Sequence, residues 1–182
     1  MDMELTYIYH SGFALSGDGF TVIMDYYRDS EDGQAQADLN RLMDGTFSNQ
    51  EAGMPEGTVH SELLRRPGKL YVLASHFHPD HFNKEVLQWR EQRPDIIYIF
   101  SKDILRHRRA QKEDAVWLKK GEEYKDETLS VRAFGSTDVG VSFLLQASGK
   151  KIFHAGDLNN WHWKEESTGE EVRGAGNAYF SE

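Results

Sequence analysis

The apolar positions at the start of the chain predict a small antiparallel sheet. Residues 5–9 and 20–24 are rich in aromatic, aliphatic and β-branched side chains, which favour strands. The segment 16–19, Ser-Gly-Asp-Gly, is typical of a turn between them. From residue 27 to 68 the sequence becomes polar, with one helix-like stretch near 35–43. We therefore expect the chain to leave the sheet there and to run over the surface.

A different pattern follows in the middle of the chain. Residues 70–75 form a continuous apolar run of strand length, which is typical of a strand covered on both faces. Asn83 can cap a helix that ends before Pro94, residues 96–100 form a second apolar strand, and Ser101 can cap another helix. The order strand, helix, strand, helix predicts parallel strands in this region.

The last part of the chain returns to hairpins. Residues 128–134, 141–147 and 151–154 read as strands, and a Ser-Gly-Lys turn at 148–150 joins the last two. No internal repeat or low-complexity linker interrupts the pattern. We therefore predict a single domain over residues 1–182, in which two mixed sheets are flanked by helices.

The strongest chemical signal follows the apolar run at 70–75. His76, His78, Asp80 and His81 form an H-x-H-x-D-H arrangement. In extended backbone, positions i and i+2 project to the same side, so the first two histidines can face one metal ion. A turn at Pro79 would bring Asp80 and His81 round to a neighbouring ion. The alternative, a metal-free surface loop, leaves three imidazoles that repel one another when protonated.

Composition limits the remaining possibilities. The chain has 38% hydrophobic residues, as an ordinary globular protein does, and no cysteine, so metal ligands must be histidines and carboxylates. Its net charge of −9 gives no broad electrostatic attraction to nucleic acid or to an anionic membrane. The acidic N-terminus lacks a signal-peptide pattern, and no apolar run approaches membrane-spanning length. We therefore expect a cytoplasmic protein whose partner is a small-molecule substrate.

Four segments together resemble one known family. The H-x-H-x-D-H loop, the opening YHSGF at 9–13, the strand end MD at 24–25 and the later FHAGD at 153–157 are similar to motifs of the metallo-β-lactamase superfamily. Within it, the chain most resembles the metal-dependent hydrolases that include the ascorbate-6-phosphate lactonases. The resemblance extends over residues 4–163 and implies an αββα sandwich.

The resemblance also implies a metal centre and a reaction. By position, His76 and His78 correspond to ligands of metal 1, Asp80 and His81 to ligands of metal 2, and Asp157 to the carboxylate that bridges both. The expected cofactor is Zn²⁺, as one or two ions, with Mn²⁺ as the alternative. The expected activity is that of a hydrolase in which a metal-bound hydroxide cleaves an ester, lactone or related bond, with Asp80 as ligand and proton acceptor.

The sequence departs from the family pattern in two places. The loop at 135–140 lacks the usual third metal-1 histidine, and Asp138 is either its oxygen substitute or only a turn residue. The last histidine is His162, too close to Asp157 to be the family's final metal-2 ligand. We therefore expect the chain to lack its C-terminal structural layer, and to self-associate as a homo-oligomer to cover the exposed edge.

Several interpretations remain open. A phosphodiesterase or nuclease could use the same fold, and the missing histidines leave room for a non-catalytic metal-binding protein with a degenerate site. His10 and His154 are candidates for contacts near the metals or for ordinary strand histidines. Asp25, at a strand end, is a candidate to orient a ligand imidazole. The sequence does not identify the substrate.

Overall fold

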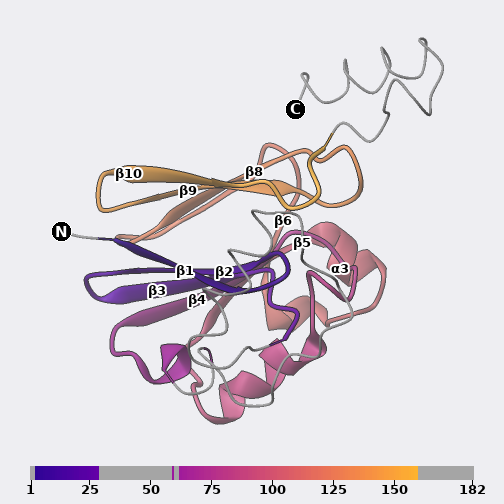
Figure 1. Cartoon of the computed structure of the whole chain (residues 1–182). Helices are drawn as coiled ribbons and strands as arrows, with labels where there is room; N and C mark the ends of the chain where they lie inside the picture. Colours follow the sequence, from indigo (N-terminus) through magenta and orange to yellow (C-terminus); the bar gives the residue numbers. More distant parts are fainter. Residues whose placement is uncertain (1–2, 29–58, 60–61, 160–182) are drawn as a thin grey trace, which may run out of the picture.

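Two β-sheets stack face to face in the computed structural model, which describes residues 3–28, 59 and 62–159 (Figure 1). The helix-like stretch near 35–43 lies outside the described residues. Most of the polar segment 27–68 and His162 also lie outside the described residues, and so does the region after residue 163 where the loss of a C-terminal layer was predicted.

The first sheet is mixed and has six strands. In spatial order these are β1 (Glu4–Tyr9), β2 (Gly12–Gly17), β3 (Phe20–Met24), β4 (Lys69–Ala74), β5 (Ile97–Ser101) and β6 (Val116–Leu118). Strands β1 to β3 are antiparallel, as predicted for the start of the chain, and β3 to β6 are parallel. The register pairs Met24 with Leu73, so β3 and β4 end side by side. Asp25 and Ser75, which follow these strands, therefore meet at one edge of the sheet.

The second sheet has four strands and is antiparallel throughout. Its spatial order is β10 (Lys150–His154), β9 (Ser142–Ala147), β8 (Ser130–Phe134) and β7 (Glu123–Lys125). The predicted hairpin between β9 and β10 is confirmed, and its turn residues Ser148 and Gly149 have positive φ angles of 47° and 73°. Such angles suit a tight two-residue turn.

Short helices follow the strands of the first sheet. They are η1 (Leu63–Arg65), η2 (Lys84–Glu91), α3 (Lys102–Arg106) and η3 (Lys112–Asp114). Asn83 caps η2 as predicted, because its side chain accepts a hydrogen bond from the backbone N–H of Glu85, although η2 is a 3-10 helix. Ser101 stands at the N-cap of α3 but makes no side-chain cap hydrogen bond. Here the prediction of a capping side chain was wrong.

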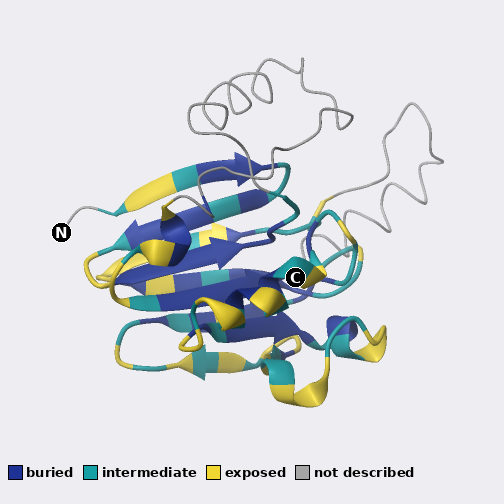
Figure 2. Cartoon of the chain, turned by 90° about the horizontal axis from the view of Figure 1, so that it is seen from below, coloured by how far each residue is buried: buried dark blue, intermediate teal, exposed yellow. Residues whose placement is uncertain are grey.

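Strand β4 separates two hydrophobic cores, which explains its continuous apolar sequence. Leu70, Val72 and Ala74 pack on the side of the helices, together with Trp89. Tyr71 and Leu73 alternate with them and face the second sheet. The predicted double burial of this strand is thus confirmed, and Figure 2 shows the central strands as mostly buried. Such a strand holds its carboxyl end, and the loop that follows, in a fixed position.

Three strands were not predicted. Residues 12–17 form β2, whereas the sequence pattern predicted no strand between 9 and 20 and only a turn at 16–19. Strands β6 and β7 have only three residues each, too few for a periodic pattern. Within the described part of the chain, none of the helices has the length and apolar character needed to cross a membrane.

Candidate metal centre

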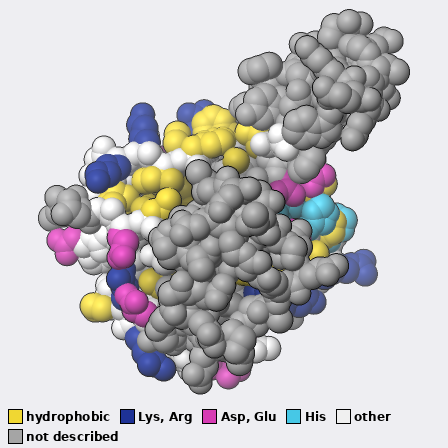
Figure 3. Space-filling model, viewed as in Figure 1, with side chains coloured by type: hydrophobic (Ala, Val, Ile, Leu, Met, Phe, Trp, Pro, Cys, Tyr) yellow, Lys and Arg dark blue, Asp and Glu magenta, His cyan; other side chains and the backbone are white. Residues whose placement is uncertain are grey.

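The H-x-H-x-D-H segment lies in the loop that directly follows β4, at the carboxyl ends of the parallel strands. Ligand sites in sheets of this kind collect at that edge. In Figure 3, histidine side chains lie at the surface beside acidic side chains. His76 and His81 are buried, whereas the side chains of His78 and Asp80 are 37% and 41% exposed, so a small molecule can reach this part of the loop.

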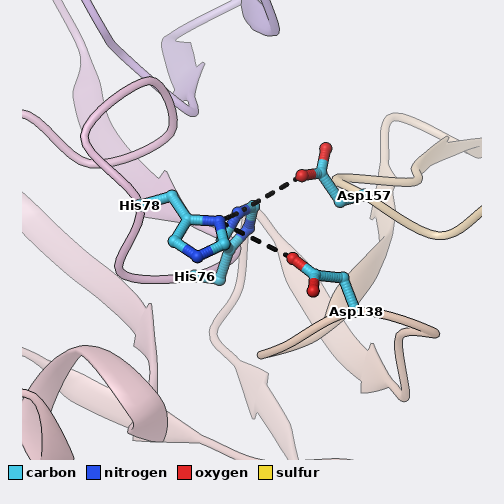
Figure 4. Close-up of side chains that lie close together, drawn as sticks. All are labelled: His76, His78, Asp138 and Asp157. Atoms are coloured by element: carbon cyan, nitrogen blue, oxygen red, sulfur yellow. Dashed lines mark hydrogen bonds and ion pairs between the residues drawn. The ribbon is translucent and has the colours of Figure 1, made fainter.

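A first group of four side chains converges on one point. Nε2 of His76 lies 3.0 Å from Nδ1 of His78, which in turn lies 3.6 Å from Oδ2 of Asp138. Oδ2 of Asp157 lies 3.5 Å from Nε2 of His76. The four ligand atoms all lie within 4.8 Å of one another (Figure 4). This set offers two nitrogens and two carboxylate oxygens to one ion.

A second group lies beside the first and contains His10, Asp80 and His81. Oδ2 of Asp80 is 3.7 Å from Nε2 of His10 and 3.8 Å from Nε2 of His81. Asp157 connects the two groups, because its other oxygen, Oδ1, lies 3.1 Å from Nε2 of His81. One carboxylate thus directs an oxygen to each group, which is the arrangement of a bridging ligand.

The buried carboxylate of Asp25 fixes the orientation of this loop. Its Oδ1 accepts the backbone N–H of Ser75 at 2.7 Å, and its Oδ2 accepts the Ser75 hydroxyl at 2.7 Å. The same Oδ2 lies 2.8 Å from Nδ1 of His81 and 2.7 Å from Nε2 of His154, both of which can donate. Because Nδ1 of His81 is engaged in this way, its Nε2 faces Asp80 and Asp157. Asp25 therefore orients a candidate ligand imidazole, as carboxylates that accept a hydrogen bond from a metal-binding histidine commonly do.

His76 is oriented by a similar contact. Its Nδ1 lies 3.0 Å from the hydroxyl oxygen of Ser75, which donates its own proton to Asp25. The hydroxyl can therefore accept the Nδ1 proton, which leaves a lone pair on Nε2 that faces His78 and Asp157. Two of the ring nitrogens in the two groups are thus prepared as ligands by their neighbours.

Burial and charge shift the pKa values of these groups in different directions. Burial alone would raise the pKa of Asp25, but the adjacent His154 and His81 outweigh it and lower that pKa far below its usual range. Burial lowers the pKa of His76. Burial also works against protonation of His81, yet Asp157 and Asp25 raise its pKa to about 10. Without a metal, His81 therefore keeps a proton that an ion must displace.

The loop that carries Asp138 packs directly against the start of the H-x-H-x-D-H loop. The backbone N–H of Val141 donates to the carbonyl oxygen of Ser75 at 3.0 Å. At Gly140, which has a positive φ of 77°, a Cβ would lie 2.2 Å from that same oxygen and 2.6 Å from Cβ of His76. Only glycine permits this approach. The absence of a side chain at Gly140 is thus what allows Asp138 to come within reach of His78.

The structure brings all six residues that the sequence singled out, His76, His78, Asp80, His81, Asp138 and Asp157, into these two groups. His10 was considered only as a neighbour of the centre, and the structure places it among the candidate ligands of the second group. Asp103 was not predicted at all. Its Oδ2 accepts the backbone N–H of Phe77 at 2.9 Å and so holds the segment between His76 and His78. No sequence motif marks that contact.

The donor set fits a divalent metal. The ring nitrogens of His76 and His78 face each other at 3.0 Å, and carboxylates stand behind both. A cation between these atoms would satisfy all of them at once, whereas protons can satisfy only some. Histidine and carboxylate ligands suit zinc, and additional carboxylate oxygens make a site more tolerant of manganese.

Solved structures with the same fold include several metalloenzymes. A metallo hydrolase from the hyperthermophilic archaeon Ignicoccus hospitalis, Igni18, aligns with a TM-score of 0.57 and 18% identity over 86% of this chain and 61% of its own. CmlA, a diiron β-hydroxylase from Streptomyces venezuelae, aligns with a TM-score of 0.57 and 16% identity over 89% of this chain and 31% of its own. A possible metal-dependent hydrolase from Veillonella parvula aligns with a TM-score of 0.53 and 14% identity over 99% and 69%.

At these identities the likeness concerns the fold alone, and the chain spans less than two thirds of the first two of these proteins. Comparison with curated proteins gives no match. The family model for the Beta-lactamase superfamily domain, however, matches residues 4–171. The predicted sandwich fold is thereby confirmed, and the chain belongs to the beta-lactamase superfamily.

Proposed function

We propose that this protein is a metal-dependent hydrolase that cleaves an ester, a lactone or a related bond of a small molecule at a two-ion centre. One observation carries the proposal. Asp157 directs one oxygen to the His76 group and the other to His81, so that two adjacent ligand sets share a carboxylate. Two-ion sites of this kind stabilise both the attacking and the leaving oxygen in hydrolysis. The lactonase-like motifs described above favour an ester or lactone as substrate.

Each side chain has a defined part in this proposal. His76, His78, Asp138 and Asp157 would hold one ion, and His10, Asp80 and His81, with the second oxygen of Asp157, would hold the other. When bound, the metal supplies a lowered water pKa and polarises the substrate carbonyl. We propose Zn²⁺ as the metal, with Mn²⁺ as the alternative.

Asp80 is the residue that we propose as proton acceptor. Its side chain is 41% exposed, so it lies at the open side of the second group, where substrate and water arrive. Its Oδ2 lies 3.7 Å from Nε2 of His10 and 3.8 Å from Nε2 of His81, within the second ligand group. In hydrolysis, Asp80 would take a proton from the water whose oxygen bonds to the acyl carbon. As the acyl C–O bond breaks, Asp80 would give that proton to the leaving alkoxide.

The metal site can be tested with the double variant His76→Ala/His78→Ala. After reconstitution with Zn²⁺ or Mn²⁺, we expect the wild type to retain one to two ions per chain by elemental analysis. The double variant should lose the first-group ion, because two of that group's four ligands are gone. His107→Ala is the matched control, because that exposed imidazole stacks on Phe77 outside both groups. Equal metal content in all three proteins would refute the metal site.

The role of Asp138 can be tested separately. Asp138→Ala should lower zinc affinity roughly 10- to 100-fold, the range typical when a residue that supports a metal site is removed. Asp138→His should keep or raise the zinc affinity. A competition titration with a zinc chelator measures the three affinities. If they are equal, Asp138 only shapes its turn, in which its N–H donates to the hydroxyl of Ser136.

The reaction needs its own experiment. We expect the metal-loaded wild type to cleave generic carboxylic esters and lactones, and the His76→Ala/His78→Ala variant to be inactive. Cleavage of phosphodiesters in preference to esters would favour the phosphodiesterase alternative. Tight metal binding without turnover of either class would favour a metal-binding protein with no catalytic role.

A further inference from the structure

A cavity of about 440 Å³ lies between the two sheets, beside the candidate metal centre. Its walls are apolar: β1, β2 and β3 contribute Leu5, Phe13 and Met24, and β10 contributes Ile152 and Phe153. In Figure 1, β10 lies in the layer opposite β1 and β3, and Figure 3 shows hydrophobic side chains at the surface on this side of the molecule. We call this space the β1–β10 cavity.

The polar groups of the cavity lie at the end nearest the candidate metal ligands. His10 and Ser11, from the turn between β1 and β2, and His154 and Gly156 line this end. His10 belongs to the second ligand group, and the Ser11 hydroxyl lies 3.5 Å from Nε2 of His81. Gly156 directly precedes Asp157. The apolar part of the cavity is thus continuous with the place where the reacting bond would lie.

The walls indicate which part of a substrate the cavity fits. Among the described residues that line it, none is Lys, Arg, Asp or Glu, so a charged group would find no counter-ion there. Leu5 and Phe153 are 58% and 51% exposed, and they are two of the three large hydrophobic side chains that the described part of the chain exposes. Exposed apolar surface that gathers at a concave site usually marks a binding surface.

The size and the edge of the cavity favour a small molecule over a second protein chain. A volume of about 440 Å³ falls in the range of small-molecule pockets, roughly 300–1,000 Å³. Strand β10 begins with the exposed residues Lys150 and Lys151. Charges of this kind at a sheet edge disfavour pairing with another strand.

We propose that the β1–β10 cavity binds the uncharged, apolar acyl chain of the substrate and so makes medium-chain acyl esters or alkyl-substituted lactones the preferred substrate class. This inference rests on the proposed hydrolase function for the identity of the reacting group. The cavity seats the chain against Phe13, Met24 and Ile152, and the carbonyl lies at the His10 end. Each methylene group that enters the cavity adds apolar contact, which is expected to raise kcat/KM about 2- to 4-fold.

A binding experiment tests the cavity without any metal or turnover. Octanamide is an uncharged eight-carbon probe, and its binding to the metal-free full chain is measured by titration calorimetry. Leu5→Glu places a carboxylate on the wall at an exposed position, where folding is not at risk, and should weaken octanamide binding at least about 10-fold. Val116→Glu is the matched control, because Val116 is also an exposed strand residue, 41% exposed, but lies on β6 outside the cavity.

A substrate series tests the acyl assignment in the metal-loaded protein. Across p-nitrophenyl acetate, butyrate and octanoate, kcat/KM should rise with chain length in the wild type and in Val116→Glu. In Leu5→Glu the ratio of octanoate to acetate should fall. A flat series in an active wild type overturns the proposal, and so does octanamide binding that Leu5→Glu leaves unchanged or that the wild type lacks.

Two further results distinguish the acyl-chain site from the proposed hydrolase function and from a dimer interface. Octanamide binding that Leu5→Glu weakens, in a protein that cleaves no ester of any length, supports the apolar site while it refutes the hydrolase function. Light scattering that shows a dimer abolished by Leu5→Glu, and not dissociated by octanamide, assigns the cavity to a second copy of the chain and overturns the proposal.

Discussion

Replacing Asp25 with alanine should lower the free energy of unfolding by about 3–5 kcal/mol, the usual result of removing one partner from a buried ionic network. Asp25 is fully buried and accepts hydrogen bonds from Ser75, His81 and His154. Its loss would leave both imidazoles without their acceptor. Chemical denaturation measures the change, and Asp18→Ala, at an exposed turn position, should stay within about 0.5 kcal/mol of the wild type.

The effect of Asp25→Ala should depend on pH in a defined direction. The folded-state pKa of Asp25 lies below its usual value, because His154 and His81 outweigh the effect of burial. A carboxylate with a lowered folded pKa stabilises the protein above its unfolded pKa of about 4 and loses this contribution as the pH falls. The difference between wild type and variant should therefore be largest between about pH 4 and 6.5, because Asp25 also raises the pKa of His81, and it should narrow below about pH 4. A difference that stays constant across this range would mean that Asp25 acts through packing alone.

Replacing Gly140 with alanine should lower the free energy of unfolding by about 2–5 kcal/mol and should also weaken metal binding. The new Cβ would lie 2.2 Å from the backbone oxygen of Ser75, and the residue would keep a positive φ of 77°. Left-handed strain costs roughly 1–2 kcal/mol, and overpacking adds roughly 1–3 kcal/mol. The 135–140 loop must then move away from the H-x-H-x-D-H loop, and this movement takes Asp138 away from His78. Thermal unfolding and zinc titration measure the two effects.

Gly19→Ala is the matched control for this prediction. Gly19 has a φ of 76°, almost the same as that of Gly140, but a Cβ there would meet no atom within 4 Å. Its substitution should therefore cost only the backbone strain of roughly 1–2 kcal/mol and leave zinc affinity unchanged. Equal losses for the two variants would show that close packing at Gly140 has no part in holding the site.

Local sequence patterns predicted the strands with a continuous or alternating apolar run and the loop that follows β4. The double burial of β4 explains why: Leu70, Val72 and Ala74 meet one core while Tyr71 and Leu73 meet the other, so every position must be apolar. Strand β2 was missed because a residue's pairing in a sheet depends on partners that the local sequence does not reveal. The same reason applies to the three-residue strands β6 and β7.

The contacts that complete the site are long-range, and local patterns do not encode them. His154 reaches Asp25 across 129 positions of the sequence, and it does so because the second sheet stacks on the first. His10 enters the second ligand group through the turn between β1 and β2, where it adopts a positive φ of 55°. The spacing of the H-x-H-x-D-H loop indicated the metal chemistry, but only the fold identifies which distant residues stand beside it.

The shared carboxylate of Asp157 has a consequence for the order in which the protein matures. Asp157 lies 76 positions after His81, the last residue of the H-x-H-x-D-H loop, so a ribosome that adds roughly 5–20 residues per second completes the loop about 4–15 s before it adds Asp157. In the proposed two-ion centre, the histidines would have no bridging partner during that interval, and neither ion position would be complete. Capture of metal would therefore follow the stacking of the second sheet. An ion that binds only after the two sheets have packed together would stabilise that packed form by mass action. Metal binding would then be a late step that holds the two sheets together.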